Sequence, residues 1–230
     1  KGNVDKLREA FKQLGFSGME EVALGADLCT IQESEDFLEE VPEKIPFMGT
    51  SCCPAWSVMA KKEFPKNADC ISMALTPMTL TARLIRKQHP NAKIVFVGPC
   101  SAKKLEAMRE SVRSEVDFVL TFEEMAGMMS AKQIDYTKLA GEGGDFDVAS
   151  ADGRGFAVAG GVATAVANAI HKRYPEREVK VANAEGLEEC RKLMKDAVKG
   201  KYDGYLLEGM ACPGGCVAGA GTLTAVNKTA

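Results

Sequence analysis

The sequence predicts an α/β fold built on mainly parallel β-sheet, and two observations support this. Short apolar segments alternate with segments of helical periodicity, which is typical of parallel strands joined by helices. The segments that carry most of the cysteines each follow a predicted strand, and sites in parallel sheets form beyond the carboxyl ends of strands. A chain of 230 residues can form one large domain or two small lobes.

The first part of the chain contains more predicted helix than strand. Apolar residues recur at helical spacing from Val4 to Leu14, and Gly15 can end that helix. Pro54 favours another helix start, because proline is well tolerated in a first helical turn. We expect helices at 4–14, 33–40, 54–64 and 77–87, and strands at 21–28 and 47–49.

The second part of the chain follows a β-α-β pattern. Thr121 and Glu124 have the spacing of a capping box, and Gly160 and Gly161 precede an apolar helical segment. The polar, glycine-rich residues 135–155 predict a loop. We expect strands at 94–97, 118–120, 179–182 and 205–208, and helices at 103–112, 121–131, 162–170 and 187–198.

The composition is typical of a globular protein and argues against two classes of partner. Hydrophobic residues make up 46% of the chain and charged residues 27%, with a net charge of −3. We expect no nucleic acid as partner, because there is no basic stripe. We expect no membrane as partner, because no apolar run is long enough for a transmembrane helix. Residue 1 is lysine and no signal-like segment follows, so we expect an excised or processed fragment.

Five of the eight cysteines lie in three short segments, at 50–56, 98–104 and 208–216. Cys52 and Cys53 are adjacent, which is a poor geometry for a mutual disulfide. The cysteine density is also far below that of a secreted disulfide-rich domain. We therefore expect ligating or reactive thiols and a cytoplasmic location.

The spacing of these cysteines is compatible with a metal site. Cys212 and Cys216 flank a tight Pro-Gly-Gly turn, and Cys53 and Cys100 raise the number of thiols to four. Four thiols and few histidines suit a 4Fe–4S cluster or a structural zinc ion. Zinc is less favoured, because zinc sites usually use paired cysteine knuckles and there is one comparable pair here. Cysteines that are simply buried in the core remain an alternative.

Three motifs resemble, in order, the signature of the catalytic domain of iron-only ([FeFe]) hydrogenases. They are TSCCP at 50–54, PCSAKKLE at 99–106 and MACPGGC at 210–216, and GADL at 25–28 and AGGV at 159–162 agree with it too. The resemblance covers most of the chain, from about residue 4 to residue 225. It implies an H-cluster as cofactor, in which a 4Fe–4S cube is bridged by one cysteine to a 2Fe unit with CO, cyanide and an amine-dithiolate.

The resemblance also implies roles for single residues. Cys52 resembles a free thiol that delivers protons, Lys103 a lysine that pairs with a cyanide ligand, and Met210 a methionine that packs near the 2Fe unit. Cys216 would bridge the cube to the 2Fe unit. The ligands of the cube would be Cys53, Cys100, Cys212 and Cys216.

A proton route is implied as well. From Cys52 it would pass to Glu33, then to Ser72, and then to Asp36, which stands where the family has glutamate. A spacing of three places both carboxylates on one face of a helix. The other three cysteines, Cys29, Cys70 and Cys190, lie outside the motifs and are expected to be ordinary core or surface thiols.

Two positions depart from the best-known pattern. Gly98 stands where methionine precedes the Pro-Cys pair, and Met78 stands in place of glutamine. These departures resemble a less-studied branch of the family. The family's first strand, with an Ala-Pro segment, would lie upstream of residue 1. We therefore expect two lobes of mainly parallel sheet flanked by helices, with the cofactor in the cleft between a truncated lobe at 1–86 and a second lobe at 87–230.

The implied function is the reversible reduction of protons to H2 in the hydrogen metabolism of an anaerobe. The implied partners are ferredoxin or N-terminal iron–sulfur domains as electron partner, and maturation proteins. The isolated fragment is expected to be inactive and to lack the 2Fe unit or any cluster, because ordinary hosts lack the maturation proteins. Two alternatives are a hydrogen-sensing module and a relative that acts in iron–sulfur protein assembly; Cys52 and Lys103 favour the catalytic interpretation.

Overall fold

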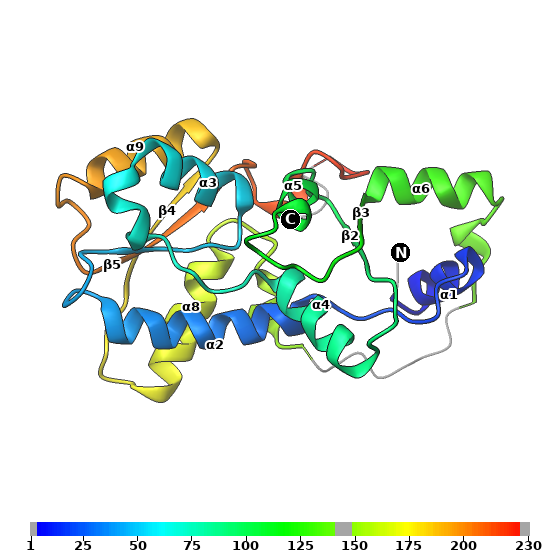
Figure 1. Ribbon diagram of the computed structural model, residues 1–230, viewed down its shortest axis with the longest axis horizontal. Helices are drawn as coiled ribbons and strands as arrows, with labels where there is room; N and C mark the ends of the chain where they lie inside the picture. The colour runs from blue at the N-terminus through cyan, green and yellow to red at the C-terminus, as the bar shows by residue number, and fades with distance from the viewer. Residues whose placement is uncertain (1–3, 141–148, 226–230) are drawn as a thin grey trace.

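The computed structural model describes residues 4–140 and 149–225 (Figure 1). Among these residues there are two parallel sheets, one toward each end of an elongated molecule. The larger sheet has the order β1 (Met48–Gly49), β5 (Tyr205–Met210) and β4 (Lys180–Glu185). The smaller sheet pairs β2 (Val95–Gly98) with β3 (Phe118–Thr121). The predicted parallel α/β class is confirmed, with three strands in the larger sheet and two in the smaller one among the described residues.

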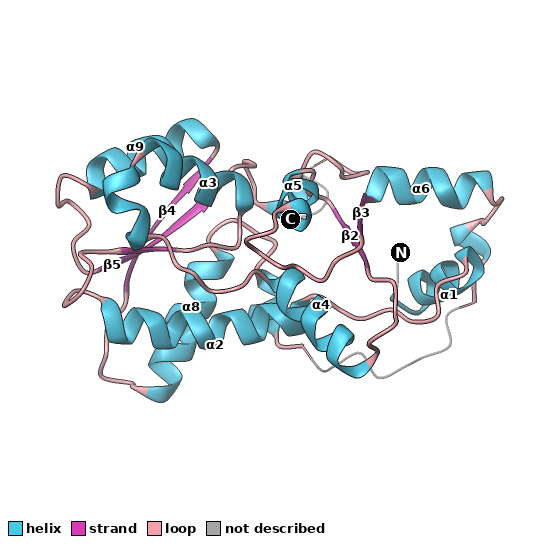
Figure 2. Ribbon diagram, viewed as in Figure 1, coloured by secondary structure: helices cyan, strands magenta, loops and turns pink. Residues whose placement is uncertain are grey.

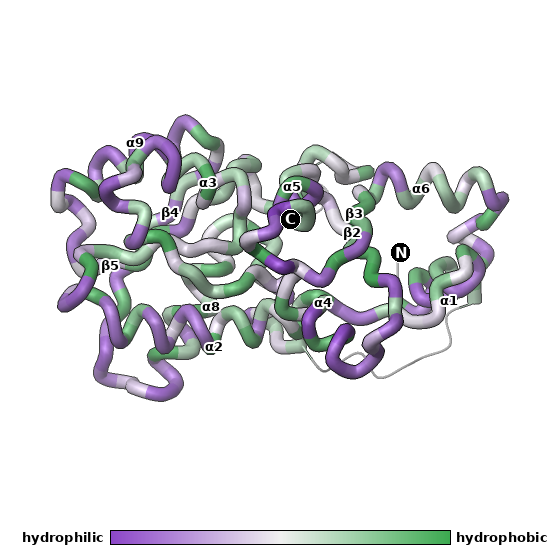
Figure 3. Tube along the Cα trace, in the orientation of Figure 1, coloured by the Kyte–Doolittle hydropathy of each residue, from purple (hydrophilic) through white to green (hydrophobic). Residues whose placement is uncertain are grey.

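The central strand β5 is apolar because helices cover both faces of the larger sheet (Figure 2). Neighbouring residues of a strand point to opposite faces. Leu206 therefore packs with residues of α2 (Ala23–Glu40) and α8 (Gly161–Arg173). Leu207 packs with residues of α3 (Pro54–Glu63) and α9 (Leu187–Ala197) on the other face. Helix α9 is mainly hydrophilic along the chain (Figure 3), and a narrow side of four buried residues contacts the sheet.

The strand predicted at 21–28 is wrong, because these residues begin the long helix α2. Val22, Leu24, Ala26 and Leu28 alternate with other residues, which imitates the period of a strand. The buried face of the helix is instead made of small and polar residues, so its helical period is hidden. Gly25 lets α2 cross α4 (Pro77–Gln88) closely, since a Cβ atom there would overlap the Pro77 carbonyl oxygen.

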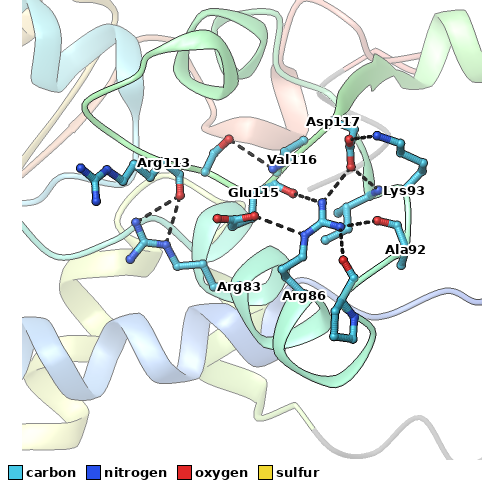
Figure 4. A network of polar contacts seen from close by, with 11 residues as sticks. Arg83, Arg86, Ala92, Lys93, Arg113, Glu115, Val116 and Asp117 are labelled. Carbon is cyan, nitrogen blue, oxygen red and sulfur yellow. Dashed lines mark hydrogen bonds and ion pairs between the residues drawn. The ribbon is translucent and has the colours of Figure 1, made fainter.

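The smaller sheet is fixed to α4 by a network of charged groups (Figure 4). Arg86 donates to Asp117 at 3.0 Å, and Arg83 donates to the carbonyl oxygens of the loop that precedes β3. Asp117 also accepts from the Ile94 amide at 2.9 Å and from Lys93 at 2.8 Å. The Ile94 amide and the Lys93 ammonium lower the pKa of Asp117 to about 2. The start of each strand in this sheet is thereby held at one end of α4.

The other elements agree with the sequence in type and differ in their ends. The helix predicted at 103–112 ends early, since α5 spans Ala102–Met108 and the following loop has positive φ at Arg113 and Glu115. The predicted capping box of Thr121 and Glu124 is present at the start of α6. The predicted loop at 135–155 contains two short helices, and its residues 141–148 lie outside the described ones. The remaining elements are α1 (Val4–Leu14), η1 (Pro65–Cys70), α6 (Phe122–Ala131), η2 (Tyr136–Lys138), α7 (Ala151–Gly155) and η3 (Cys216–Ala218).

The larger sheet combines strands that are far apart in the sequence. Met48 of β1 is paired with Leu206 of β5, so the sheet joins residues from both sides of position 86. The division into lobes at 1–86 and 87–230 stays a prediction, and this strand pairing crosses it.

Candidate functional site

Each of the three cysteine segments directly follows a strand. Cys52 and Cys53 come after β1, Cys100 comes after β2, and Cys212 comes after β5. Because β1 and β5 are parallel neighbours, their carboxyl ends bring the first and third segments to the same edge of the sheet. All of these thiols are free; Cys53 is buried and the others are partly buried.

The turn between Cys212 and Cys216 requires glycine. Gly214 and Gly215 have φ angles of +90° and +87°, which side chains rarely adopt. A Cβ atom on Gly215 would also lie 2.5 Å from the Ala159 amide nitrogen. The turn therefore packs closely on residues 157–159, where the Val217 amide donates to the Ala157 carbonyl at 3.0 Å. This contact explains why the AGGV segment accompanies the cysteine turn.

The segment after Cys216 brings Cys100 to the other cysteines. It runs from the end of the larger sheet to the smaller sheet (Figure 1). The Gly221 amide donates to the Pro99 carbonyl at 2.9 Å, one residue before Cys100. Gly219 also packs on Pro99, where a Cβ atom would overlap the carbonyl oxygen. The second and third cysteine segments are thus joined by direct backbone contact.

Two of the four predicted ligands, Cys212 and Cys216, have raised pKa values to which the other cysteine segments contribute. Burial raises the pKa of Cys216 to about 12, with contributions from Cys53 and Cys100, while the Lys103 cation opposes the rise. Burial also raises the pKa of Cys212, again with contributions from Cys100 and Cys53. Within residues 4–140 and 149–225, no three His, Cys, Asp or Glu side chains are grouped tightly enough for a single metal ion. The pKa contributions show that thiols of all three cysteine segments lie near one another.

The chemistry of this donor set suits an iron–sulfur cluster. Thiolates are the usual ligands of 4Fe–4S clusters, and all four predicted ligands are cysteines. Ligation requires each thiol to lose its proton, so the raised pKa values of Cys212 and Cys216 keep them neutral until a metal binds.

Lys103 lies next to Cys52 and is buried. Its ammonium donates to the Cys52 carbonyl at 3.2 Å and to Glu106 at 2.6 Å. Our sequence analysis did not assign a role to Glu106, although its spacing of three from Lys103 on α5 was a usable signal. The pKa of the Cys52 thiol is raised by burial and then by the Glu33 carboxylate.

Glu33 is fully buried in the middle of α2. Its Oε1 accepts from the Ser51 amide at 3.1 Å, while Oε2 has no hydrogen-bond partner among the described residues. Burial raises the pKa of Glu33 to about 7, and the Ser51 amide and the Ser72 hydroxyl partly oppose this rise. Glu33, Ser72 and Cys52 are thus brought together by the fold.

Asp36 lies one turn beyond Glu33 on α2 and is partly exposed. Its carboxylate accepts a hydrogen bond from Gln32 at 2.8 Å, and its charge helps to raise the pKa of Glu33. The predicted position on one helix face with Glu33 is therefore present, with Asp36 toward solvent.

Met210 and the three remaining cysteines are packed in the interior. Met210 ends β5, is 2% exposed, and accepts through its carbonyl from the Gly186 amide at 2.8 Å. Cys29, Cys70 and Cys190 are buried and free. Burial raises the pKa of each of their thiols.

Glu208 is a buried carboxylate that the sequence analysis missed. It accepts from the amides of Gly160 and Ala163, each at 2.7 Å, and thus caps the start of α8 from the neighbouring strand β5. Burial raises its pKa, and these amides oppose the rise. The signal was its place in the third cysteine segment, at 208–216, two residues before Met210. Its contacts fix the AGGV segment against the cysteine turn.

In the part of the chain that the structure describes, no helix is both long and apolar enough to cross a membrane. This finding agrees with the absence of a long apolar run in the sequence.

Comparisons with known proteins agree with the motifs. A family model described as "Iron only hydrogenase large subunit, C-terminal domain" matches residues 1–220. Iron hydrogenase 1 of Clostridium pasteurianum is 28% identical over 94% of this chain and 45% of its own length. A cytosolic Fe-S cluster assembly factor, NAR1 of Debaryomyces hansenii, is 32% identical over 54% of this chain and 26% of its own length.

The fold also matches a solved structure. The apo [FeFe]-hydrogenase HydA1 from Chlamydomonas reinhardtii, variant C377H, superposes with a TM-score of 0.79 and 22% identity. The match covers 99% of this chain and 76% of that chain, and at this identity it concerns the fold alone. The chain spans about half the length of the first curated relatives that it matches.

Proposed function

Because the chain belongs to the family of iron-only hydrogenase large subunits, C-terminal domain, we propose that it holds an H-cluster and interconverts H2 with protons and electrons. One observation carries the proposal. Thiols from the ends of three strands lie near enough to interact, since Cys53 and Cys100 both contribute to raising the pKa of Cys212 and of Cys216. Such a donor set suits a multi-iron cofactor.

We assign each proposed ligand its own part in the site. Cys53, Cys100 and Cys212 would bind the 4Fe–4S cube, and Cys216 would bind both the cube and the 2Fe unit. Lys103 would pair with an anionic ligand of the 2Fe unit, since its ammonium is buried beside Cys52. When bound, the cofactor supplies the redox chemistry, and the protein supplies ligands, protons and exclusion of water.

The chain's own residues would move the proton. Cys52 would exchange it at the cofactor, and Glu33 would accept it, because a group with a pKa of about 7 can gain and lose a proton near neutral pH. Ser72 and Asp36 would continue the route toward solvent. Glu33 Oε2 has no hydrogen-bond partner among the described residues. This oxygen is therefore free to take part in the proposed proton transfer.

The proposal includes partners and location. Electrons would come from a ferredoxin or from N-terminal iron–sulfur domains, and maturation proteins would supply the 2Fe unit. H2 and protons would be the substrates, and the location would be cytoplasmic. The similarity to a cluster assembly factor supports a second candidate, a role in iron–sulfur protein assembly. Hydrogen turnover separates the two candidates.

The test is hydrogen evolution from reduced methyl viologen by the full-length protein after maturation. Cys52→Ala should lower the rate by about 100-fold or more, because a positioned proton donor contributes about 10²- to 10⁴-fold. The iron content and the infrared bands of CO and cyanide should stay unchanged, because Cys52 is not a proposed ligand. The matched control is Cys70→Ala, which removes a buried thiol outside the motifs and should leave the rate unchanged. A matured wild-type protein without hydrogen evolution would contradict the proposed activity.

A further inference from the structure

We propose that Glu106 is the counter-ion that holds the Lys103 ammonium beside Cys52, and is therefore a positioning residue of this site. The inference rests on the proposed function, in which Lys103 faces an anionic ligand of the cofactor. It adds a buried carboxylate, and the hydroxyl groups of Thr76 and Thr79 that bind it, to the residues of the site.

Lys103 and Glu106 form a buried ion pair. Lys103 Nζ lies 2.6 Å from Glu106 Oε2, and the two side chains are 10% and 4% exposed. The same ammonium donates to the Cys52 carbonyl at 3.2 Å. An ammonium has three donors, and these contacts use two of them. The third N–H remains for a further acceptor.

Glu106 is itself held in place. Its other oxygen, Oε1, accepts from the Thr76 hydroxyl at 2.5 Å and from the Thr79 hydroxyl at 3.3 Å. Thr76 caps the N-terminus of α4, where the helix dipole favours a negative charge. The carboxylate is thus bound on one side by α4 and on the other by Lys103, and it cannot turn away from either.

The buried ammonium of Lys103 needs a counter-charge. A buried ammonium without a partner loses its proton or moves to solvent, because the interior does not solvate a charge. Without Glu106, the charge of Lys103 would not stay next to the Cys52 carbonyl. Glu106 therefore determines where the positive charge of the site lies before any cofactor binds.

The chain offers a matched control for this ion pair. Lys192 and Glu189 are also three residues apart on a helix and are also 2.6 Å apart, but their side chains are 60% and 56% exposed. This pair has the same spacing and the same separation in solvent, with the acid and the base in the opposite order along the helix. It separates the effect of burial from the effect of pairing.

The first experiment measures equilibrium unfolding of the unloaded chain in urea at pH 7. E106Q should raise the equilibrium constant for unfolding at least about 100-fold, because it leaves a buried charge unpaired. In the K103M background the same change should raise it less than about 10-fold, since no ammonium remains. E189Q should change it less than about threefold, with or without K192M. If E106Q raised the equilibrium constant for unfolding equally in the wild-type and K103M backgrounds, the proposal would be overturned.

The second experiment uses the matured protein and its infrared bands. E106Q should move the cyanide bands, T79V should move them less, and T79S should restore the wild-type positions; E189Q should leave them unchanged. Bands that are present but unmoved in E106Q would overturn the positioning role. Bands absent from the matured wild type would overturn the proposed function, and the unfolding experiment would still decide the role of Glu106.

Discussion

Three carboxylates near the cysteine segments are buried, and each is stabilised differently. Glu208 accepts from two backbone amides, and Glu106 is paired with an ammonium and two hydroxyl groups. Glu33 accepts from one backbone amide, and the hydroxyl groups of Ser51 and Ser72 lie nearby. No cation is among its described partners, and its pKa is raised to about 7. Glu33 is therefore a group that can change its charge near neutral pH, which suits a proton carrier.

The raised pKa of Glu33 makes folding stability depend on pH. The folded state keeps the proton between the ordinary pKa of 4.5 and about 7, whereas the unfolded state loses it. Stability should therefore fall by about 3 kcal/mol as the pH rises from 4.5 to 7. Glu33→Gln should remove this slope, as measured by urea unfolding at several pH values.

The control for this slope lies two residues away. Glu35 is exposed on the same helix, and Glu35→Gln should keep the slope of the wild type. An unchanged slope in Glu33→Gln would show that Glu33 titrates normally in the folded protein.

The site residues that sequence could predict are those fixed by spacing along the chain. Cys52 and Cys53 were predicted to follow a strand, and they do. Glu208 and Ser51 were missed, because their contacts join segments that are far apart in the sequence.

At the level of elements, the helix α2 shows where local patterns fail. Its first residues alternate like a strand, whereas the neighbouring helices α4 and α8 select small and polar residues for the buried face. Tertiary packing thus overrides the local period. By contrast, α6 carries its own start signal in Thr121 and Glu124, and its prediction is confirmed.

The close crossing of α2 and α4 makes Gly25 sensitive to substitution. Gly25→Ala should destabilise the protein by about 1–3 kcal/mol, because the new methyl group overlaps the Thr81 hydroxyl and the Pro77 carbonyl. Gly127→Ala is the matched control, since nothing lies within 4 Å of a Cβ atom there in α6. It should stabilise the protein by about 0.5–1 kcal/mol. Thermal unfolding of both variants shows whether each change raises or lowers stability. If both changes raise or both lower it, the close crossing of α2 and α4 is not what makes Gly25 sensitive.

At the level of the whole molecule, two small sheets are held together by long-range contacts. The segment after Cys216 reaches Pro99 at the end of β2, and Arg86 fixes the starts of β2 and β3 on α4. The sequence predicted the strands but not the pairing of β1 with β5, because pairing between strands so far apart along the chain leaves no local signal.

The contribution of Asp117 to folding stability should depend on pH in the acid range. Its pKa is lowered from 3.8 to about 2. The stabilisation of the folded state by its charge is therefore complete above the ordinary pKa and is lost as the pH falls through about 2. Asp117→Asn should cost up to about 2 kcal/mol at neutral pH and almost nothing in acid near the lowered pKa. Urea unfolding under both conditions measures this difference, and exposed Asp203→Asn should show no such difference. A cost of Asp117→Asn that does not change with pH would contradict the role of its charge.

The position of β5 in the larger sheet has a consequence for the timing of synthesis. Both β1 and β4 pair with β5, so neither has its strand partner until residues 205–210 have left the ribosome. The first cysteine pair is therefore made long before the segments that complete its surroundings. During most of synthesis Cys52 and Cys53 have no β5 beside them, and the proposed cofactor site can form only after the chain has been translated beyond Cys216.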